Sequence, residues 1–520
     1  MLKSRTLPVH PFLFTLYPLL YLYAENLGQV TFPQIYRAGA VFLILTGVLL
    51  ASLWRIFRDW HLAGMLVSLF MILFFSFGHA GKALRDANWS GSVWVLAGIW
   101  GVIFCAGAAL ILWKARQRAD LTRILNISSG FLFLVSGYTI FSAGIVHPVK
   151  AQVDYLVSPT AATFYPEKDL LPAAGDVEHP PDIYYIILDG YAQGSVLQDL
   201  YHLDNTPFLD FLQQKGFQIA DNSHTNYIQT ILSLSSSLNF AYLDQLVTLY
   251  PGTYSREPVD RLLKNSRVQK FLRSKGYQII TLDSGYEYTN LDEADKVVHS
   301  AFSLNAYEQN LLGTTLAMPW LDQIMVKIYR EEILSRFLAL AGVAEMSGPK
   351  FVFVHLVVPH PPFVFKRDGG ETDITFLGKN DGSHYKEDSA TYRVRYKEQL
   401  LYINQLTEEM IEGILRSAKT PPVILLQGDH GPGSYLDWNS LENTCVRERT
   451  SILNALYLPD ASVQIPSDLT PVNSFRIVLN TYFGTHLELA ANRTYYSLWD
   501  DPYRFMEVSG EVDSCAPLDR

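Results

Sequence analysis

The sequence predicts an α/β fold in which an N-terminal bundle of about five transmembrane helices precedes a domain with a mainly parallel sheet flanked by helices. Two patterns carry this prediction. Residues 1–146 are dominated by long apolar stretches, as in chains that cross a membrane. After residue 181, short apolar runs alternate with amphipathic stretches, which is the pattern of βαβ units. With 520 residues, the chain is long enough to form both parts.

Five apolar stretches make up the expected membrane anchor, residues 1–146. They are Pro11–Tyr23, Ala38–Trp54, Leu62–Phe77, Val93–Trp113 and Ile127–Val146. Most approach the length of about 20 residues that crosses a bilayer as a helix, and the first and third are shorter. Residues 147–181 contain six prolines and no sustained period, which is typical of a linker. The folded catalytic domain is expected over residues 182–520.

Basic residues near the ends of these stretches predict the orientation, because lysine and arginine concentrate on the cytoplasmic side. One side receives Lys3, Arg5, Arg55, Arg58, Lys114, Arg116, Arg118 and Arg123, and the other receives only Arg37, Lys82 and Arg85. With the N-terminus inside and five crossings, everything after His147 lies outside the cytoplasm. One crossing fewer would invert this. We therefore expect a multi-pass protein of the cell membrane with an extracytoplasmic domain.

Net charge and cysteine positions narrow the function classes. The formal net charge is −10, and no basic stripe suited to phosphate backbones is present, so nucleic acid is not an expected partner. Cys105 lies in the fourth apolar stretch. Cys445 and Cys515 lie in the expected external domain, where they could pair, although two free thiols fit the sequence equally well.

Three apolar runs of the second part end in residues that can bind a metal. Ile183–Leu188 is followed by Asp189, Phe351–Val358 by Pro359 and His360, and Val423–Leu426 by Gln427, Gly428, Asp429 and His430. If the three strands are parallel, these side chains gather at the carboxyl edge of one sheet, where ligands bind in open α/β folds. Two carboxylates and an imidazole are costly to bury together unless a cation neutralises them. The sequence therefore predicts a metal site.

A hydroxyl nucleophile is expected near a helix N-terminus, where the helix dipole and a metal both favour an alkoxide. Thr230 precedes the helix-like run Ile231–Leu238 and fits this position. Thr225 and Ser233 are rival nucleophiles on the same grounds. Thr230 could also serve only as a helix N-cap.

These residues resemble the alkaline phosphatase superfamily, in its sulfatase-like branch that includes lipoteichoic acid synthases and lipid A phosphoethanolamine transferases. The resemblance spans Asp182 to Leu458. It rests on the order of four motifs, namely strand-Asp189-Gly190, Thr230-x-x-Ser233-Leu234, His355-Leu-x-x-Pro-His360-x-Pro-Phe363 and Asp429-His430-Gly431. A membrane anchor of five segments before an external catalytic domain is similar to those transferases.

The resemblance implies one divalent metal ion held by Asp189, Asp429 and His430, with Thr230 as fourth ligand and nucleophile. His360 corresponds to the family histidine that contacts the transferred group or protonates the leaving oxygen. These ligands suit zinc, manganese or magnesium, and the sequence does not choose among them. The expected fold is an alkaline-phosphatase/sulfatase-like domain, and the expected reaction is transfer or hydrolysis of a phosphoryl-linked group on an envelope lipid or glycan.

Two departures from the branch refine this expectation. The cysteines do not form Cys-x-Pro-Ser-Arg, and Thr230 stands in the nucleophile position, so sulfatase activity through formylglycine is disfavoured. No Asp-x-x-x-His element lies between His360 and Asp429, which favours one metal over two. Sulfate ester hydrolysis by another mechanism and a non-catalytic envelope-binding module are the alternatives.

Other polar residues could assist the site. They are His355 and His384 as additional histidines, and Arg447 or Arg449 as a phosphate-binding guanidinium, although a solvated turn suits these arginines better. Leu311–Ala341 is apolar at helical spacing but carries charges, which indicates a surface or membrane-apposed helix pair.

Overall fold

The computed structural model divides into two compact units, which are described separately. Unit 1 comprises residues 1–156 and 304–325, and unit 2 comprises residues 157–303 and 326–520. The structure describes residues 6–157 and 175–516 apart from 27–29, 31, 88, 90, 114–117, 176, 178, 251–254, 292, 300–303, 375–387 and 460–461. His384 lies outside the described residues.

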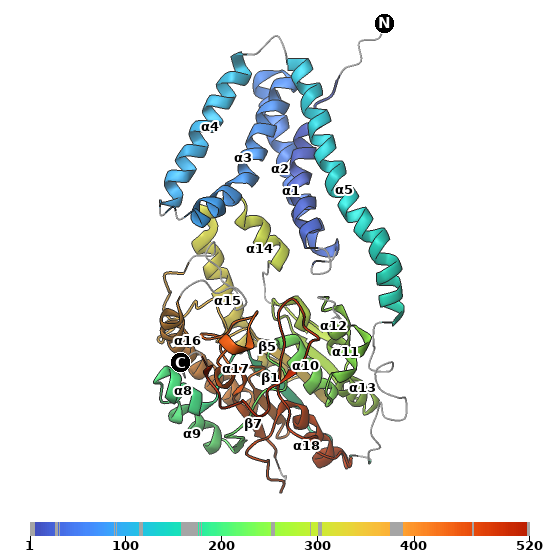
Figure 1. Ribbon diagram of the computed structural model, residues 1–520, viewed down its shortest axis with the longest axis vertical. Coiled ribbons are helices and arrows are strands. Elements are labelled where there is room, and N and C mark those ends of the chain that lie inside the picture. The colour runs from blue at the N-terminus through green and yellow to red at the C-terminus, as the bar shows by residue number, and fades with distance from the viewer. Residues whose placement is uncertain are drawn as a thin grey trace. The chain divides into compact units, whose positions relative to one another are not determined.

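Five helices form the membrane part of unit 1 (Figure 1), namely α1 (His10–Glu25), α2 (Phe32–Phe57), α3 (Trp60–Asp86), α4 (Val93–Trp113) and α5 (Arg118–Val157). Within α2 to α5, four segments are long and apolar enough to cross a membrane: Gln34–Phe57, Trp60–Leu84, Val93–Trp113 and Arg118–Ser142. The third predicted stretch is thus longer than its sequence indicated. Helix α1 has 16 residues and is shorter than a full crossing requires. The predicted bundle of about five apolar helices is confirmed.

The start of α1 is tied to α5 by one side chain. Asn126 Oδ1 accepts hydrogen bonds from the amides of Val9 (3.1 Å) and His10 (3.0 Å), and its Nδ2 donates to the carbonyl of Leu7 (2.9 Å). Asn126 therefore supplies the partner that the first amides of a helix lack. Since Asn126 lies two turns into α5, both helices begin at the same end of the bundle.

Two segments of distant sequence complete unit 1. Helix α14 (Ala306–Gly313) and the first part of α15 (Met318–Ala344) lie among the membrane helices, and Tyr307 and Leu311 of α14 belong to their buried core. Arg37 of α2 forms an ion pair with Glu308, with Nε 2.6 Å from Oε1. The predicted helix pair over Leu311–Ala341 is therefore displaced, because this range contains only the last three residues of α14 and most of the single long helix α15.

A seven-stranded sheet forms the centre of unit 2, in the order β2-β7-β6-β1-β5-β3-β4. The strands are β1 (Ile183–Leu188), β2 (Phe217–Ile219), β3 (Gln278–Leu282), β4 (Lys296–Val298), β5 (Lys350–Leu356), β6 (Val423–Gln427) and β7 (Asn454–Tyr457). Strand β7 runs antiparallel to both of its neighbours, β2 and β6, and the other pairings among these strands are parallel. A short pair, β8 (Tyr495–Tyr496) and β9 (Met506–Glu507), lies apart from the sheet.

Alternate residues of the central strands enter two separate cores, because successive strand side chains point to opposite faces. Ile183, Tyr185 and Ile187 of β1 face one core, and Tyr184, Ile186 and Leu188 face the other. All six are buried, which explains why the run is continuously apolar.

Helices cover both faces of the sheet (Figure 1). The first core receives residues of α10 (Thr230–Asn239), α11 (Asp244–Leu249), α12 (Glu257–Lys264), α13 (Arg267–Ser274) and α18 (Pro471–Phe483). The second receives residues of α8 (Gly194–Tyr201), α9 (Thr206–Gln214), α15 from Val326 onward and α16 (Ser389–Ser417). The short helix α17 (Val446–Thr450) precedes β7. The predicted mainly parallel sheet flanked by helices is confirmed.

The ends of the membrane anchor and of the linker remain predictions. Helix α5 continues past Val146, the predicted end of the last crossing, to Val157. Hydrophobicity marks where a helix can leave a bilayer, whereas backbone hydrogen bonding sets where the helix ends, so the two limits need not coincide.

Cys445 and Cys515 form a disulfide, which the sequence left undecided. This bond joins the residue before α17 to the C-terminal segment. We expect Cys515→Ser to lower the free energy of unfolding by about 2–4 kcal/mol, because the open chain gains conformational freedom when unfolded. Denaturant unfolding with and without reductant measures this. Cys105→Ser, which removes a free thiol, serves as the control, and equal stability of the two variants would contradict the expectation.

Candidate metal centre and nucleophile

Asp189 follows the last residue of β1 at the carboxyl edge of the sheet. Its amide donates to the carbonyl of Leu356 at 3.0 Å, which continues the pairing of β1 with β5 by one residue. Its own carbonyl accepts from the amide of His360 at 3.0 Å. The side chain is 3% exposed. Backbone pairing on both sides therefore fixes the position of this carboxylate.

Asp429 and His430 stand beyond the end of β6 and are both 1% exposed. Asp429 Oδ1 accepts from the amide of Gly190 at 3.1 Å, which joins the ends of β6 and β1. Gly431 follows, and a Cβ at this position would lie 2.0 Å from the carbonyl oxygen of Glu448. Only glycine fits there, so the Asp-His-Gly sequence reflects close packing as well as chemistry.

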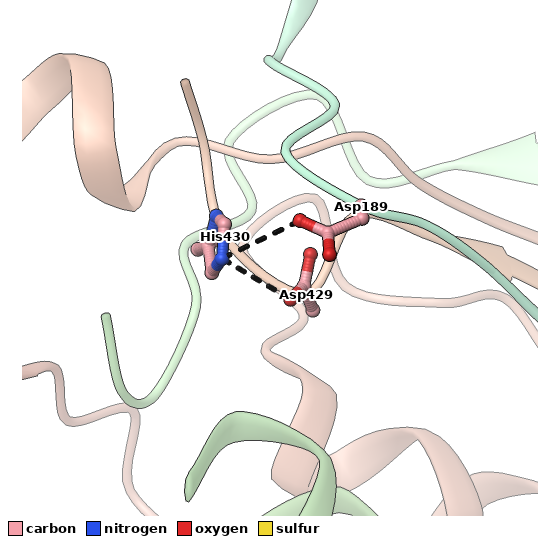
Figure 2. A group of neighbouring side chains, drawn as sticks. All are labelled: Asp189, Asp429 and His430. Atoms are coloured by element: carbon pink, nitrogen blue, oxygen red, sulfur yellow. Dashed lines mark ion pairs between the residues drawn. The ribbon is translucent and has the colours of Figure 1, made fainter. Parts of the chain in front are cut away.

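The three side chains converge on one point (Figure 2). His430 Nε2 lies 3.2 Å from Asp429 Oδ2 and 3.6 Å from Asp189 Oδ1. Each residue offers a ligand atom, and these atoms lie within 4.8 Å of one another. Among the described residues, neither Asp189 Oδ1 nor Asp429 Oδ2 has a hydrogen-bond partner, although both are buried. Buried carboxylate oxygens without partners are costly, and a cation between them would remove that cost.

The proton on His430 is placed to leave a ligand nitrogen available. Nδ1 lies 2.9 Å from the carbonyl oxygen of Gly431, and since a carbonyl only accepts, Nδ1 carries the hydrogen. Nε2 then presents its lone pair to the carboxylates. Burial and the charge of Arg449 lower the pKa of His430 to about 4, so the ring is neutral at physiological pH. Two oxygens and a neutral imidazole nitrogen form a donor set that fits a divalent cation.

Three histidines act on Asp189. Burial favours its neutral form, but His360, a hydrogen bond from His355, and His430 together hold the pKa of Asp189 well below its usual range. His355 Nε2 donates to Asp189 Oδ2 at 3.1 Å, and His355 Nδ1 accepts from the hydroxyl of Thr289 at 2.8 Å. His355 thus binds one carboxylate oxygen and leaves the other directed at His430, as outer partners of metal ligands commonly do.

Thr230 is the first residue of α10, and Gln229 is its N-cap. The N-cap alternative for Thr230 is therefore wrong, because the helix begins at Thr230 itself, one residue earlier than that alternative requires. Thr230 Oγ1 lies 3.0 Å from His430 Nε2, and the residue is only half-buried. The hydroxyl thus adjoins the three clustered side chains, on a residue that keeps part of its surface exposed.

The rival hydroxyls have a structural task. Thr225 Oγ1 and Ser233 Oγ donate to the backbone carbonyl of Asp429 at 2.6 and 2.7 Å, and they lie 3.0 Å from each other. Both side chains are almost fully buried. They hold the turn that carries Asp429 rather than face a substrate.

His360 lies at the rim of the cluster and is half-buried. Its ring centroid is 6.4 Å from that of His430, and its Nδ1 donates to the carbonyl of Pro361 at 2.6 Å. This bond assigns the hydrogen to Nδ1 and leaves Nε2 as the nitrogen for proton exchange. The structure thus brings together all four residues predicted at the metal, with His360 beside them.

The family model described as Sulfatase matches residues 181–463, which is more than half of the chain. The chain belongs to the sulfatase family. The predicted membership of the alkaline phosphatase superfamily is thereby confirmed. A search of curated proteins finds no match to this sulfatase-family chain.

Solved structures that resemble the sulfatase-family chain do so at low similarity. The periplasmic domain of EcEptC from Escherichia coli, in complex with Zn, has a TM-score of 0.43 and 14% identity, covering 65% of this chain and 96% of that one. Lipooligosaccharide phosphoethanolamine transferase A (EptA) from Neisseria meningitidis has a TM-score of 0.38 and 13% identity, covering 91% of this chain and 95% of that one. A putative sulfatase from Bacteroides thetaiotaomicron has a TM-score of 0.37 and 14% identity, covering 60% of this chain and 72% of that one.

Arg449 of this sulfatase-family protein joins two segments beside the candidate site, a role that its sequence context did not indicate. Its Nε and Nη2 donate to the carbonyl of Ile228 at 3.0 and 2.8 Å, and Nη1 donates to the carbonyl of Gly431 at 2.9 Å. It therefore links the segment before Thr230 to the residue after His430. The only hint in the sequence was an arginine at a strand entry, which predicted a solvated turn or a phosphate contact, whereas Arg449 is 5% exposed. Arg447, by contrast, pairs with Asp199 at 2.5 Å.

Proposed function

We propose that this sulfatase-family protein is a membrane-anchored, divalent-metal-dependent phosphotransferase or phosphodiesterase that acts on an envelope lipid or glycan outside the cytoplasm. One observation carries the proposal. Two buried carboxylate oxygens, which have no hydrogen-bond partner in the part of the chain that the structure describes, face the unprotonated nitrogen of His430, and the Thr230 hydroxyl lies 3.0 Å from that nitrogen. This arrangement suits a cation and an adjacent oxygen nucleophile.

Asp189, Asp429 and His430 would hold one divalent ion, zinc, manganese or magnesium, with Thr230 as fourth ligand. A bound divalent ion supplies a Lewis acid that lowers the pKa of a neighbouring hydroxyl. Thr230 sits at the N-terminus of α10, where the helix dipole also favours a negative oxygen. Both effects favour loss of the Thr230 proton to solvent.

The proposed reaction has two displacements. Thr230 Oγ1 forms a bond to phosphorus while the bond between phosphorus and the leaving oxygen breaks. That oxygen takes the Nε2 proton of His360, which enters this step as the imidazolium and leaves it as the neutral ring with its hydrogen on Nδ1. An acceptor hydroxyl or water then attacks phosphorus and gives its proton to His360, and the bond to Thr230 breaks. Splitting one difficult step into two easier ones is the gain of nucleophilic catalysis.

The expected outward orientation has two supports. Helices α1 and α5 begin at the same end of unit 1, so five alternating segments leave the end of α5 opposite the N-terminus. Unit 2 also carries the Cys445–Cys515 disulfide, a bond typical of oxidising compartments outside the cytoplasm.

Sulfate ester hydrolysis is the second candidate, favoured by the family match itself. The threonine in the nucleophile position argues against the formylglycine mechanism. Rates with bis(p-nitrophenyl) phosphate and with p-nitrophenyl sulfate on one preparation distinguish the two candidates. Turnover of the sulfate alone would support the second.

Metal removal tests the proposal. We expect dialysis against chelator to abolish phosphodiester turnover and one divalent ion per chain to restore it, because a cation between the two buried carboxylates compensates their charge and completes the ligand set. Metal analysis by mass spectrometry of protein purified without chelator gives the stoichiometry. A preparation with full activity and no divalent ion would refute the proposal, and a stoichiometric ion without any turnover would favour a binding module.

A further inference from the structure

The turn between α14 and α15 is hydrogen-bonded to the backbone of membrane helix α3. The amide of Gly78 donates to the carbonyl of Thr314 at 2.8 Å, and the amide of Leu316 donates to the carbonyl of Phe74 at 2.8 Å. In a regular helix the Gly78 amide and the Phe74 carbonyl are each other's partners. The turn provides a second partner for both groups.

Gly78 makes this close approach possible. A Cβ at residue 78 would lie 2.2 Å from the carbonyl oxygen of Gly313 and 2.6 Å from Thr314 Cα. These are backbone atoms, which cannot rotate away as a side chain can. Any other residue at position 78 would displace the turn from α3.

The contact lies inside the apolar span of α3. That span is Trp60–Leu84, so Gly78 is six residues, about 9 Å, from its end. Backbone at such a depth must have its polar groups satisfied by protein. The turn meets this requirement, since the hydroxyls of Thr314 and Thr315 donate to the carbonyls of Leu311 and Leu312, each at 2.7 Å. No charged residue occurs in the sequence between Glu308 and Asp322.

Three large apolar side chains are exposed next to this turn. Trp320 and Ile324 at the start of α15 are 57% and 51% exposed, and Trp94 at the start of α4 is 51% exposed. The rings of Trp94 and Trp320 contact each other edge to face at 5.2 Å. Paired tryptophans at the end of a membrane span are typical of the zone between lipid head groups and acyl chains.

We propose that the α14–α15 turn is a re-entrant element of the membrane unit, whose residues 313–317 lie within the bilayer against α3. Trp94, Trp320 and Ile324 form its lipid-contacting face. The bilayer is the occupant because this face is continuous with α3 and α4, which are themselves apolar enough to span a membrane. Helix α15 is unbroken to Ala344, and its residues from Val326 onward lie in unit 2. The inference does not depend on the proposed reaction.

Spin-label accessibility in lipid nanodiscs tests this inference. In a Cys105→Ala background, Ile324→Cys is labelled, and collision with oxygen, which enters lipid, is compared with collision with a water-soluble nickel chelate. Leu134→Cys in the α5 span and Val394→Cys on α16, 68% and 57% exposed, are the lipid and water references. We expect residue 324 to behave as residue 134 does. Nickel access equal to that of residue 394 overturns the proposal, and so does exclusion of both reagents, which would indicate a second protein chain on this face.

Two glycine-to-alanine substitutions test the contact between the α14–α15 turn and α3. We expect Gly78→Ala to raise nickel access at residue 324 several-fold, because the added methyl group pushes the turn away. Gly101→Ala is the matched control, since a Cβ at this membrane-helix glycine has no atom within 4 Å. Equal nickel access at residue 324 in the two variants would contradict the contact between the turn and α3. Because the label at residue 324 reads the parent chain directly, the first test decides even if Gly78→Ala does not fold.

Discussion

Replacing Thr230 by alanine is expected to reduce phosphodiester turnover on the order of 10³-fold or more, as loss of a covalent nucleophile does. The metal should remain bound, because Asp189, Asp429 and His430 keep their side chains and water can take the fourth position. Stopped assays with bis(p-nitrophenyl) phosphate measure turnover, and metal analysis of the same samples measures occupancy. The two readings separate loss of the nucleophile from loss of the site.

Two control variants refine this expectation. Thr230→Ser keeps a hydroxyl at the start of α10 and should retain most of the activity. Ser233→Ala removes a rival hydroxyl that donates to the Asp429 carbonyl, and the nearby Thr225 hydroxyl donates to the same carbonyl, so moderate loss is expected. If Thr230→Ala stays active while Ser233→Ala does not, the assignment of the nucleophile is wrong.

Replacing Arg449 by methionine is expected to lower the free energy of unfolding by about 3 kcal/mol, since three charged hydrogen bonds are lost and the Ile228 carbonyl is left buried. Activity should fall further than stability alone explains, because Arg449 joins the segment before Thr230 to the residue after His430. Arg449→Lys keeps the charge but cannot reach both carbonyls, so it should rescue only part of either loss.

Arg447 provides a matched comparison two residues away. Its ion pair with Asp199 joins partly exposed side chains, and Arg447→Met should cost less than about 1 kcal/mol. Denaturant unfolding of the two methionine variants, together with kcat and KM, gives the comparison. Similar losses in both variants would show that Arg449 has no special role in positioning the site.

The clustering of Asp189, Asp429 and His430 could be predicted from the sequence because strand ends are local features. Asp189, Asp429 and His430 each follow a short apolar run, and parallel pairing alone brings such ends to one edge. His360 follows a third run for the same reason. Apolar residues also recur at helical spacing over Glu398–Ile414, and α16 (Ser389–Ser417) contains this segment.

Contacts between distant segments could not be predicted in the same way. Because β7 is antiparallel to β6, it begins at the edge where β6 ends, and α17 with Arg449 stays at that edge near Ile228 and Gly431. No local pattern specifies that arrangement. The hydrogen bond between Thr289 and His355 also joins distant segments, and no local pattern specifies it. The turn of residues 313–317 lies with the membrane helices, although the chain before residue 304 and after residue 325 belongs to unit 2.

Mass spectrometry of the enzyme quenched in acid during turnover tests the central claim most directly. With bis(p-nitrophenyl) phosphate and bound metal, we predict a p-nitrophenylphosphoryl adduct on the peptide that contains Thr230, localised to that residue by fragmentation. The adduct should be absent from chelator-treated protein and from Asp429→Asn. An adduct on Thr225 or Ser233, or sustained turnover with no covalent adduct under conditions in which the second displacement is slow, would contradict the account.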